Sequence, residues 1–269
     1  MEHSGNLACA ASPCILDNAG KEASTRFHAL SSAFDPGTIR HLEDLGVSLG
    51  WRCLEVGGGG GSIAAWLAAR VAPTGHVLVT DIDPRFLDSL KLANAEVRRH
   101  NIATDPLPES AFDLVHARLV LVHLPERDKA LARMVATLKP GGWILAEEFD
   151  SSVSPDSVLS PGEVLTKTHI AMTRLMEDRG VDRNFGRCLF GRLRALGLVG
   201  VAAEGRTFMW PSGSPGPSLM HVNYEQLHAD MIAAGYLTQQ EFDQDVAALN
   251  DPHFFMPSPI LWAARGRRP

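Results

Sequence analysis

The residues best suited to chemistry lie in one short stretch, in which an acid precedes a run of glycines. Glu55 is followed by Val56 and then by five glycines, Gly57 to Gly61. Glycine is required where a backbone φ angle is positive or where a ligand must touch the main chain. The Glu55 carboxylate, two residues before the first glycine, suits a ligand with a cationic amino group. The alternative, a flexible glycine linker, fits poorly because strongly patterned segments flank the stretch on both sides.

The spacing of the glycines argues against a dinucleotide site. A dinucleotide-binding loop follows the pattern G-x-G-x-x-G, which brings the backbone close to a pyrophosphate. Counted from Gly57 the last position is Ser62, and counted from Gly58 it is Ile63. A carboxylate at Glu55 would also face the phosphates. A nicotinamide-dependent oxidoreductase is therefore the less favoured alternative, and a test of NAD(P)H binding would separate the two.

Asp81 is a second chemical signal. It ends the β-rich run 76–81, about 20 residues after the glycines, where an acid accepts hydrogen bonds from ribose hydroxyls. The alternative is a helix N-cap or a solvated loop acid, and Pro84 shortly afterwards fits either interpretation.

The elements that must position these residues alternate between strand and helix. Strands are predicted at 53–56, 76–81, 112–115 and 143–146, and helices at 62–71, 84–99 and 126–138. This alternation predicts an α/β, doubly wound, mostly parallel sheet that is covered by helices on both faces. The glycines and Asp81 then lie at the carboxyl edge of that sheet, where such folds bind ligands.

Segments outside this core predict a cap and a lid. Residues 1–49 form an N-terminal arm and helical cap, with a helix start expected at Asp35-Pro36 and an end at Gly46. Residues 50–204 form the core, with a capping box at Ser160–Glu163 that begins a helix near 160–180. Residues 205–259 form a helical lid with helices near 223–234 and 238–250, and 260–269 return as the last strand.

Composition limits the classes of partner. The 269 residues carry 25 Lys and Arg against 31 Asp and Glu, a net charge of −6, which disfavours nucleic acid. The four cysteines form no C-x-x-C pair, so no metal site is expected. The chain also shows neither a signal peptide nor a membrane span, which predicts a cytoplasmic protein without a membrane partner.

Together, these features resemble a known family. The stretch Glu55–Gly61, Asp81, the segment from Asp105-Pro106-Leu107-Pro108 to Phe112-Asp113-Leu114-Val115, and Leu138-Lys139-Pro140-Gly141-Gly142 look like the class I S-adenosylmethionine (SAM) dependent methyltransferases. Within the class, the chain is most similar to bacterial methyltransferases that act on small secondary metabolites. The resemblance covers about residues 50–150 and implies a seven-stranded, Rossmann-like sheet with SAM as cofactor.

The resemblance also implies roles for individual residues. Gly57, Gly59 and Gly61 would approach the methionine part of SAM, and Glu55 would orient its amino-acid end. Asp81 would hold the ribose hydroxyls, and Ile82 would pack on the adenine. Further cofactor contacts come from Asn101 and Ile102 after the third strand of the family's sheet, where Asn101 replaces the usual acid, and from the backbone of Ala117.

The implied reaction is transfer of a methyl group from SAM to an O, N or C atom of a small aromatic or apolar molecule, as in natural-product biosynthesis. His123 and Glu148 are the candidates for deprotonating or positioning that acceptor, and the alternative for both is local packing or capping. Aromatic residues of the lid, among them Trp210 and Tyr224, either line the acceptor pocket or form ordinary core. A non-methylating cyclase or binding module is the alternative function. The arm and lid are candidate surfaces for a homodimer.

Overall fold

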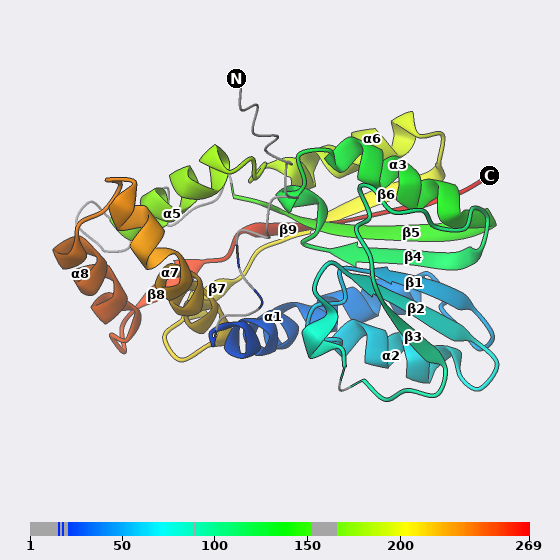
Figure 1. Cartoon of the computed structure of the whole chain (residues 1–269), viewed down its shortest axis with the longest axis horizontal. Coiled ribbons are helices and arrows are strands. Elements are labelled where there is room, and N and C mark those ends of the chain that lie inside the picture. The colour runs from blue at the N-terminus through cyan, green and yellow to red at the C-terminus, as the bar shows by residue number, and fades with distance from the viewer. Residues whose placement is uncertain (1–15, 17, 19–20, 89, 152–165) are drawn as a thin grey trace, which may run out of the picture.

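The chain folds around a seven-stranded sheet with helices on both faces (Figure 1). A computed structural model describes residues 16, 18, 21–88, 90–151 and 166–269. The strands run in the order β3-β2-β1-β4-β5-β9-β6. Their bounds are β1 Arg52–Val56, β2 His76–Asp81, β3 Ala95–Arg99, β4 Phe112–Arg118, β5 Leu138–Asp150, β6 Val199–Arg206 and β9 Ile260–Arg267. The neighbours from β3 to β5 are parallel and β9 is antiparallel to both of its neighbours, which confirms the doubly wound, mostly parallel fold.

Helices cover the two faces of the sheet because alternate strand residues point to opposite sides. Leu54 and Val56 pack in one apolar cluster with α3 and α6, whereas Cys53 packs in another with α2 and the end of α1. The helices are α1 Ala23–Asp44, α2 Ser62–Val71, α3 Arg127–Thr137, α5 Thr166–Asp178, α6 Leu189–Ala195, α7 Pro215–Ala233 and α8 Gln239–Leu249. Short 3₁₀ turns are η1 Pro84–Phe86, η2 Leu121–His123 and η3 Phe185–Cys188.

The helix expected over residues 84–99 is wrong. Only η1 forms there, and Ala95–Arg99 instead make the edge strand β3, parallel to β2. The residues of this segment are good helix formers, but the unpaired backbone of β2 recruits them into the sheet. This edge strand brings Asn101 and Ile102 close to the end of β2, where the family resemblance expects them.

The helix start expected at Asp35-Pro36 is also wrong, because α1 continues through Pro36. A proline inside a helix loses one backbone hydrogen bond. Burial of Phe34, Thr38 and Leu42 on either side of it holds the helix together. The expected helix end is confirmed, since Gly46 has a φ angle of 78°.

The helices of the late insertion, α7 and α8, gather with α5 from the preceding segment beside the sheet, at the left of Figure 1. The helices α5, α7 and α8 pack on the first half of α1 in an apolar cluster that includes Phe34, Trp210 and Tyr224. The strands β7 Met209–Pro211 and β8 Phe255–Pro257 form a two-stranded sheet at its base. The capping box of Thr238 and Glu241 begins α8 as expected. The box expected at 160–163 lies outside the described residues.

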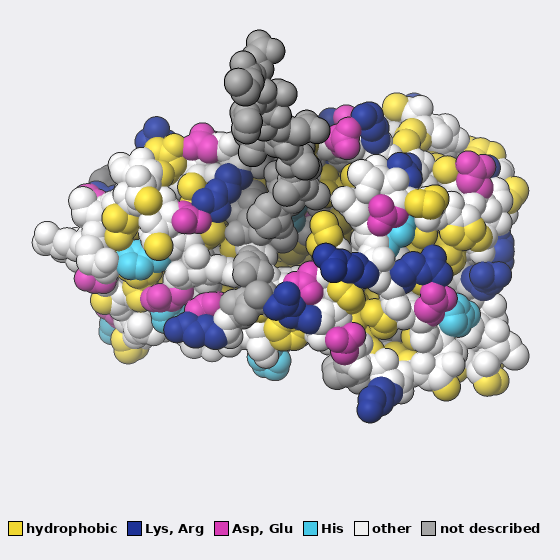
Figure 2. All heavy atoms as spheres, in the orientation of Figure 1, with side chains coloured by type: hydrophobic (Ala, Val, Ile, Leu, Met, Phe, Trp, Pro, Cys, Tyr) yellow, Lys and Arg dark blue, Asp and Glu magenta, His cyan; other side chains and the backbone are white. Residues whose placement is uncertain are grey.

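The surface carries charges of both signs. On the face drawn in Figure 2, acidic and basic side chains are interspersed over the sheet half and the lid half alike. Within the described ranges, no helix is long and apolar enough to cross a membrane.

Candidate active site

The glycine run is the turn between β1 and α2, and its backbone has the conformation that glycine favours. Gly57, Gly59 and Gly61 have φ angles of 71°, 51° and 82°. The amides of Gly57 and Gly58 donate to the carbonyl of Thr80 at 2.7 and 3.1 Å, which ties the turn to the end of β2. The loop is therefore a fixed turn at the carboxyl edge of the sheet and the start of a helix, where backbone amides accommodate ligands.

There is no room for side chains along this loop. A Cβ atom on Gly57 would lie 2.3 Å from Val120 Cγ2, and one on Gly61 would lie 2.4 Å from Leu90 Cδ1. Phe27 of α1 covers the next glycines, since its ring lies 3.0 Å from a Cβ built on Gly59. The glycines thus serve both the backbone conformation and the close approach of neighbouring groups.

We expect Gly57→Ala to lower the free energy of unfolding by about 2 kcal/mol, because a left-handed φ and an overpacked side chain each add to the cost. Gly213→Ala is the matched control, since Gly213 has a φ of 77° and nothing within 4 Å of a built Cβ. Urea unfolding of both variants measures the difference. Equal destabilisation of the two would contradict the packing argument.

Asp81 is the last residue of β2 and is buried. Its two carboxylate oxygens accept from the amide of Gly59 at 2.9 Å and from that of Asp83 at 2.9 Å. Burial raises the pKa of Asp81, and these amides act in the opposite direction. The side chain thereby fixes the glycine loop, and each oxygen has a second lone pair for a ligand hydroxyl.

Glu55 belongs to a buried chain of charges on the α1 face of the sheet. Its Oε2 lies 2.6 Å from His116 Nδ1, and His116 Nε2 lies 3.1 Å from Oε2 of Glu147. The three residues come from the neighbouring strands β1, β4 and β5, and all are nearly inaccessible to solvent. Burial by itself would lower the pKa of His116, but the two carboxylates raise it to about 9. Two carboxylates and one imidazolium leave this cluster with one net negative charge.

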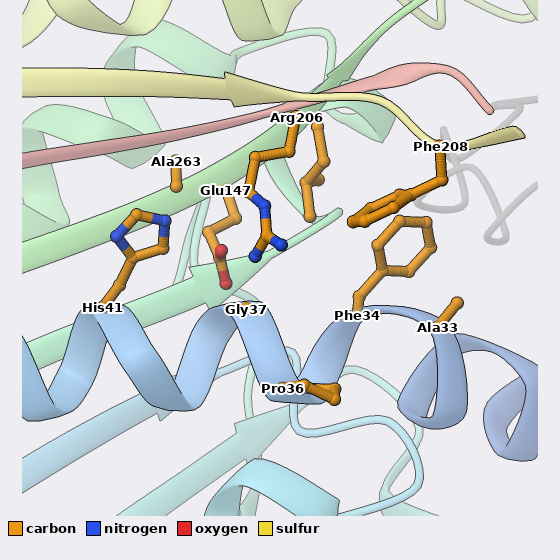
Figure 3. Close-up of a pocket in the computed structure, with 10 residues that line it drawn as sticks. Ala33, Phe34, Pro36, Gly37, His41, Glu147, Arg206, Phe208 and Ala263 are labelled. Atoms are coloured by element: carbon orange, nitrogen blue, oxygen red, sulfur yellow. The ribbon is translucent and has the colours of Figure 1, made fainter. Parts of the chain in front are cut away.

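The chain of charges continues to α1. Thr38 donates to Glu147 Oε2 at 2.6 Å, Arg118 donates to Thr38 at 2.8 Å, and Arg118 also pairs with Asp35 at 2.7 Å. Figure 3 shows the Glu147 carboxylate directed at α1 near Gly37, inside a small cavity of about 210 Å³. The cap helix is thus hydrogen-bonded to the same network that holds Glu55.

The glycine loop, Glu55 and Asp81 open into one large cavity of about 1660 Å³. Pockets for a single small ligand are typically about 300–1,000 Å³, so this one has room for two molecules. The end away from the glycines lies between α1, α5 and α7. Its apolar lining includes Leu30, Phe149, Met172, Met176, Leu219 and Met220.

Most of the site residues expected from the sequence meet in this cavity. The lining includes Glu55, Gly57, Gly59, Asp81, Ile82, Asn101, Ile102 and His123. Among the described lining residues, Gly61, Ala117 and Glu148 are not found. Gly61 instead precedes α2 in a left-handed conformation, and Ala117 is buried within β4.

Glu148 does not face the cavity. Its carboxylate accepts from the backbone amides of Val120 at 3.0 Å, Leu121 at 2.6 Å and Val122 at 3.3 Å. Burial raises the pKa of Glu148 to about 8, although the three amides oppose this shift. The expectation that Glu148 deprotonates the acceptor therefore finds no geometric support, because the side chain caps η2 beneath the cavity wall.

His123 faces the cavity from the end of η2. Burial lowers the pKa of His123 to about 4, and the nearby charge of Arg26 contributes to the shift. The imidazole is consequently neutral at physiological pH. Its Nδ1 is buried and has no hydrogen-bond partner among the described residues.

Several lining residues were missed from the sequence. Arg26 of α1 is 4% exposed and donates to Gln226 of α7 and to Asn18. His100 lies just after β3, and Asn223 of α7 reaches the cavity from the lid. Trp210 and Tyr224 pack in the core instead. Met172 and Met176 have the i, i+4 spacing of one helix face, which was the available signal for the apolar wall.

The sheet order, the glycine loop and the acid at the end of β2 are arranged as the resemblance to the class I methyltransferases implies. Residues 54–146 match the family model described as a methyltransferase domain. The residues present fit SAM: a tight glycine turn that lines the cavity, the buried Asp81 carboxylate for the ribose, and the Glu55 carboxylate for an ammonium group.

The chain is similar to methyltransferase str2 from Strobilurus tenacellus, with 34% identity over 54% of this chain and 52% of that protein. It is also similar to the ubiquinone/menaquinone biosynthesis C-methyltransferase UbiE from Vibrio vulnificus, with 34% identity over 47% of this chain and 56% of that protein. The matches span about half the length of these relatives.

Solved structures share the fold. A phosphoethanolamine N-methyltransferase 2 from Haemonchus contortus, in complex with phosphomonomethylethanolamine and S-adenosylhomocysteine, has a TM-score of 0.61 at 16% identity and covers 97% of this chain and 61% of its own. The YcgJ protein from Bacillus subtilis has a TM-score of 0.56 at 14% identity and covers 90% of this chain and 98% of its own.

Proposed function

We propose that this protein transfers a methyl group from SAM to a small, largely apolar organic molecule. The observation that carries the proposal is the single cavity, which joins the glycine loop and Asp81 at one end to an apolar chamber at the other. Methyl transfer requires such an arrangement, because donor and acceptor must meet in line and away from water.

The chain's own residues divide the work between the two ends of the cavity. Asp81 accepts the ribose hydroxyls, the glycine backbone approaches the methionine part, and Glu55 offers a carboxylate to the ammonium group. SAM, when bound there, supplies an electrophilic methyl group on its sulfonium sulfur. Phe27 lies over the loop and excludes water from this end. These roles follow the family resemblance and are supported by the shared lining of the cavity.

The acceptor end favours an aromatic or long apolar molecule with a few polar atoms. Methionine side chains adapt to irregular shapes, and they contact aromatic rings favourably. Asn223 and His123 supply polar groups among them, and each has a buried atom without a partner among the described residues. A natural-product acceptor with an apolar body and a few polar atoms suits this lining.

We propose that His123 is the general base when the acceptor must lose a proton. We expect His123→Asn to lower kcat about a hundredfold while leaving the affinity for S-adenosylhomocysteine unchanged, as is typical for loss of a general base. Because burial lowers the pKa of His123 to about 4, the wild-type rate should show no inflection from this group near pH 6.5. An unchanged kcat of His123→Asn with an acceptor that the wild type methylates would rule out the role of His123 as general base.

Two measurements test the function. The first is calorimetric titration with S-adenosylhomocysteine, with NADH as the control, and binding of the former alone is expected. The second follows formation of S-adenosylhomocysteine from SAM with a panel of apolar phenols, quinols and amines. Binding without turnover on any of the panel would favour the non-methylating alternative, and binding of NADH would overturn the assignment.

A further inference from the structure

His100 lies at the wall of the large cavity, and its buried imidazole has no hydrogen-bond partner among the described residues. It is the first residue after β3, and its amide donates to the carbonyl of Asp81 at 2.8 Å. Its side chain is 6% exposed and contributes to the lining of the large cavity, in company with Ile82 and Ile102. His100 and Asp81 thus line the same cavity from neighbouring strand ends.

Both ring nitrogens of His100 are buried, and neither has a hydrogen-bond partner among the described residues. A neutral imidazole has one donor and one acceptor nitrogen, and buried polar groups in proteins are nearly always paired. Leaving them unpaired destabilises a fold measurably. A histidine in this state at a cavity wall is best explained by a partner that arrives with a ligand.

For the neighbouring Asn101 the family resemblance predicts a cofactor contact, but its side chain is already used within its own loop. Asn101 Oδ1 accepts from the amide of Ala103 at 3.0 Å. Asp105 in turn accepts from the amide of Asn101 at 2.8 Å and from the hydroxyl of Thr104 at 3.0 Å. The polar side chains of this loop therefore stabilise the loop itself, whereas the imidazole of His100 makes no such hydrogen bond.

We propose that a ring nitrogen of His100 accepts a hydrogen bond from the exocyclic amino group of the SAM adenine, and this inference rests on the proposed function. Asp81 and Arg99 are opposite each other in the β2–β3 pair, so His100 is the next residue outward from the ribose site. Ile82 and Ile102, which line the cavity together with His100, offer apolar side chains for the faces of the base.

The imidazole can meet the base without rearrangement of the backbone. A half-turn of the ring about its Cβ–Cγ bond exchanges each nitrogen with a carbon inside the same outline, so it can bring a nitrogen to the cavity side. The assignment of ring nitrogens and carbons in a histidine is normally decided by such partners. The cofactor thereby supplies the hydrogen bond that the His100 ring lacks.

The test is a binding cycle on the full chain. S-adenosylhomocysteine and its 6-deamino analogue, which lacks the exocyclic amino group, are titrated by calorimetry into the wild type, His100→Leu, His100→Gln and Asn101→Ala. We expect the wild type to prefer the adenine compound about tenfold, the worth of one buried hydrogen bond. His100→Leu should bind both compounds equally and weakly.

The remaining variants make the result specific. His100→Gln retains an acceptor at a similar reach and should recover part of the preference, whereas Asn101→Ala should keep all of it. Thermal unfolding of each variant controls for loss of fold. If His100→Leu and His100→Gln keep the full preference, or if Asn101→Ala alone abolishes it, the inference is overturned. If the wild type binds neither compound, the proposed function itself fails.

Discussion

Replacement of His116 by glutamine is expected to lower the free energy of unfolding by about 3 kcal/mol or more, because it leaves two buried carboxylates without their cation. His116 lies 2.6 Å from Glu55 and 3.1 Å from Glu147, and the ring is inaccessible to solvent. Glutamine is neutral and can donate to only one of the two acids at a time. Urea unfolding at pH 7 measures the loss.

The same variant should remove a pH dependence. The pKa of His116 is raised from 6.5 to about 9 in the folded protein, so its stabilising effect is complete below pH 6.5 and disappears as the pH rises through 9. At 1.36 kcal/mol for each pKa unit, the wild type should lose about 3 kcal/mol over this range. The curve for His116→Gln should be nearly flat there.

A matched control is available in another strand of the same sheet. His76 is a partly exposed histidine at the start of β2, and His76→Gln should change stability by only about 0.5 kcal/mol or less. If His116→Gln keeps the wild-type pH profile, other groups cause the profile and the charge assignment for His116 is wrong.

Replacement of Asp81 by alanine is expected to weaken the binding of S-adenosylhomocysteine about a hundredfold. Hydrogen bonds to a charged group contribute about 1.5–3 kcal/mol each, and the loss of about 3 kcal/mol corresponds to that factor. Asp81 also accepts the amide of Gly59 at 2.9 Å, so the variant loosens the glycine loop as well. Calorimetric titration measures the affinity.

Asp83 provides a control for disruption of the segment after β2. It caps η1 and pairs with Arg85 at 2.9 Å, close to the loop but outside the lining of the cavity. Asp83→Ala should therefore leave the affinity almost unchanged. Equal losses for both variants would mean that disruption of the segment after β2, rather than a contact with the ribose, causes the effect.

The contacts of α1 reach beyond the face of the sheet that it covers. Its first half carries Phe27 over the glycines and Arg26 bonded to α7, while its second half bonds Glu147 through Thr38. One helix thus connects the lid, the glycine loop and the buried charges.

The sequence by itself determined the elements whose causes are local. Five glycines between two patterned segments predict a turn with positive φ angles, and Thr238 with Glu241 predicts the start of α8. Ser62–Val71 and His76–Asp81 were predicted with their observed bounds, because apolar periodicity and β-branched residues act within a few positions. These features were sufficient for the fold and for the cofactor class.

Only the tertiary structure decided which distant groups meet. The partner of Glu55 is His116, 61 residues later, and the three amides that hold Glu148 lie 26 to 28 residues before it. Residues 95–99 form a strand because they pair with the edge of β2, and this pairing places His100 at the wall of the cavity. Such outcomes depend on the juxtaposition of strands and on burial, which change pKa values and hydrogen bonding in ways that no local pattern encodes.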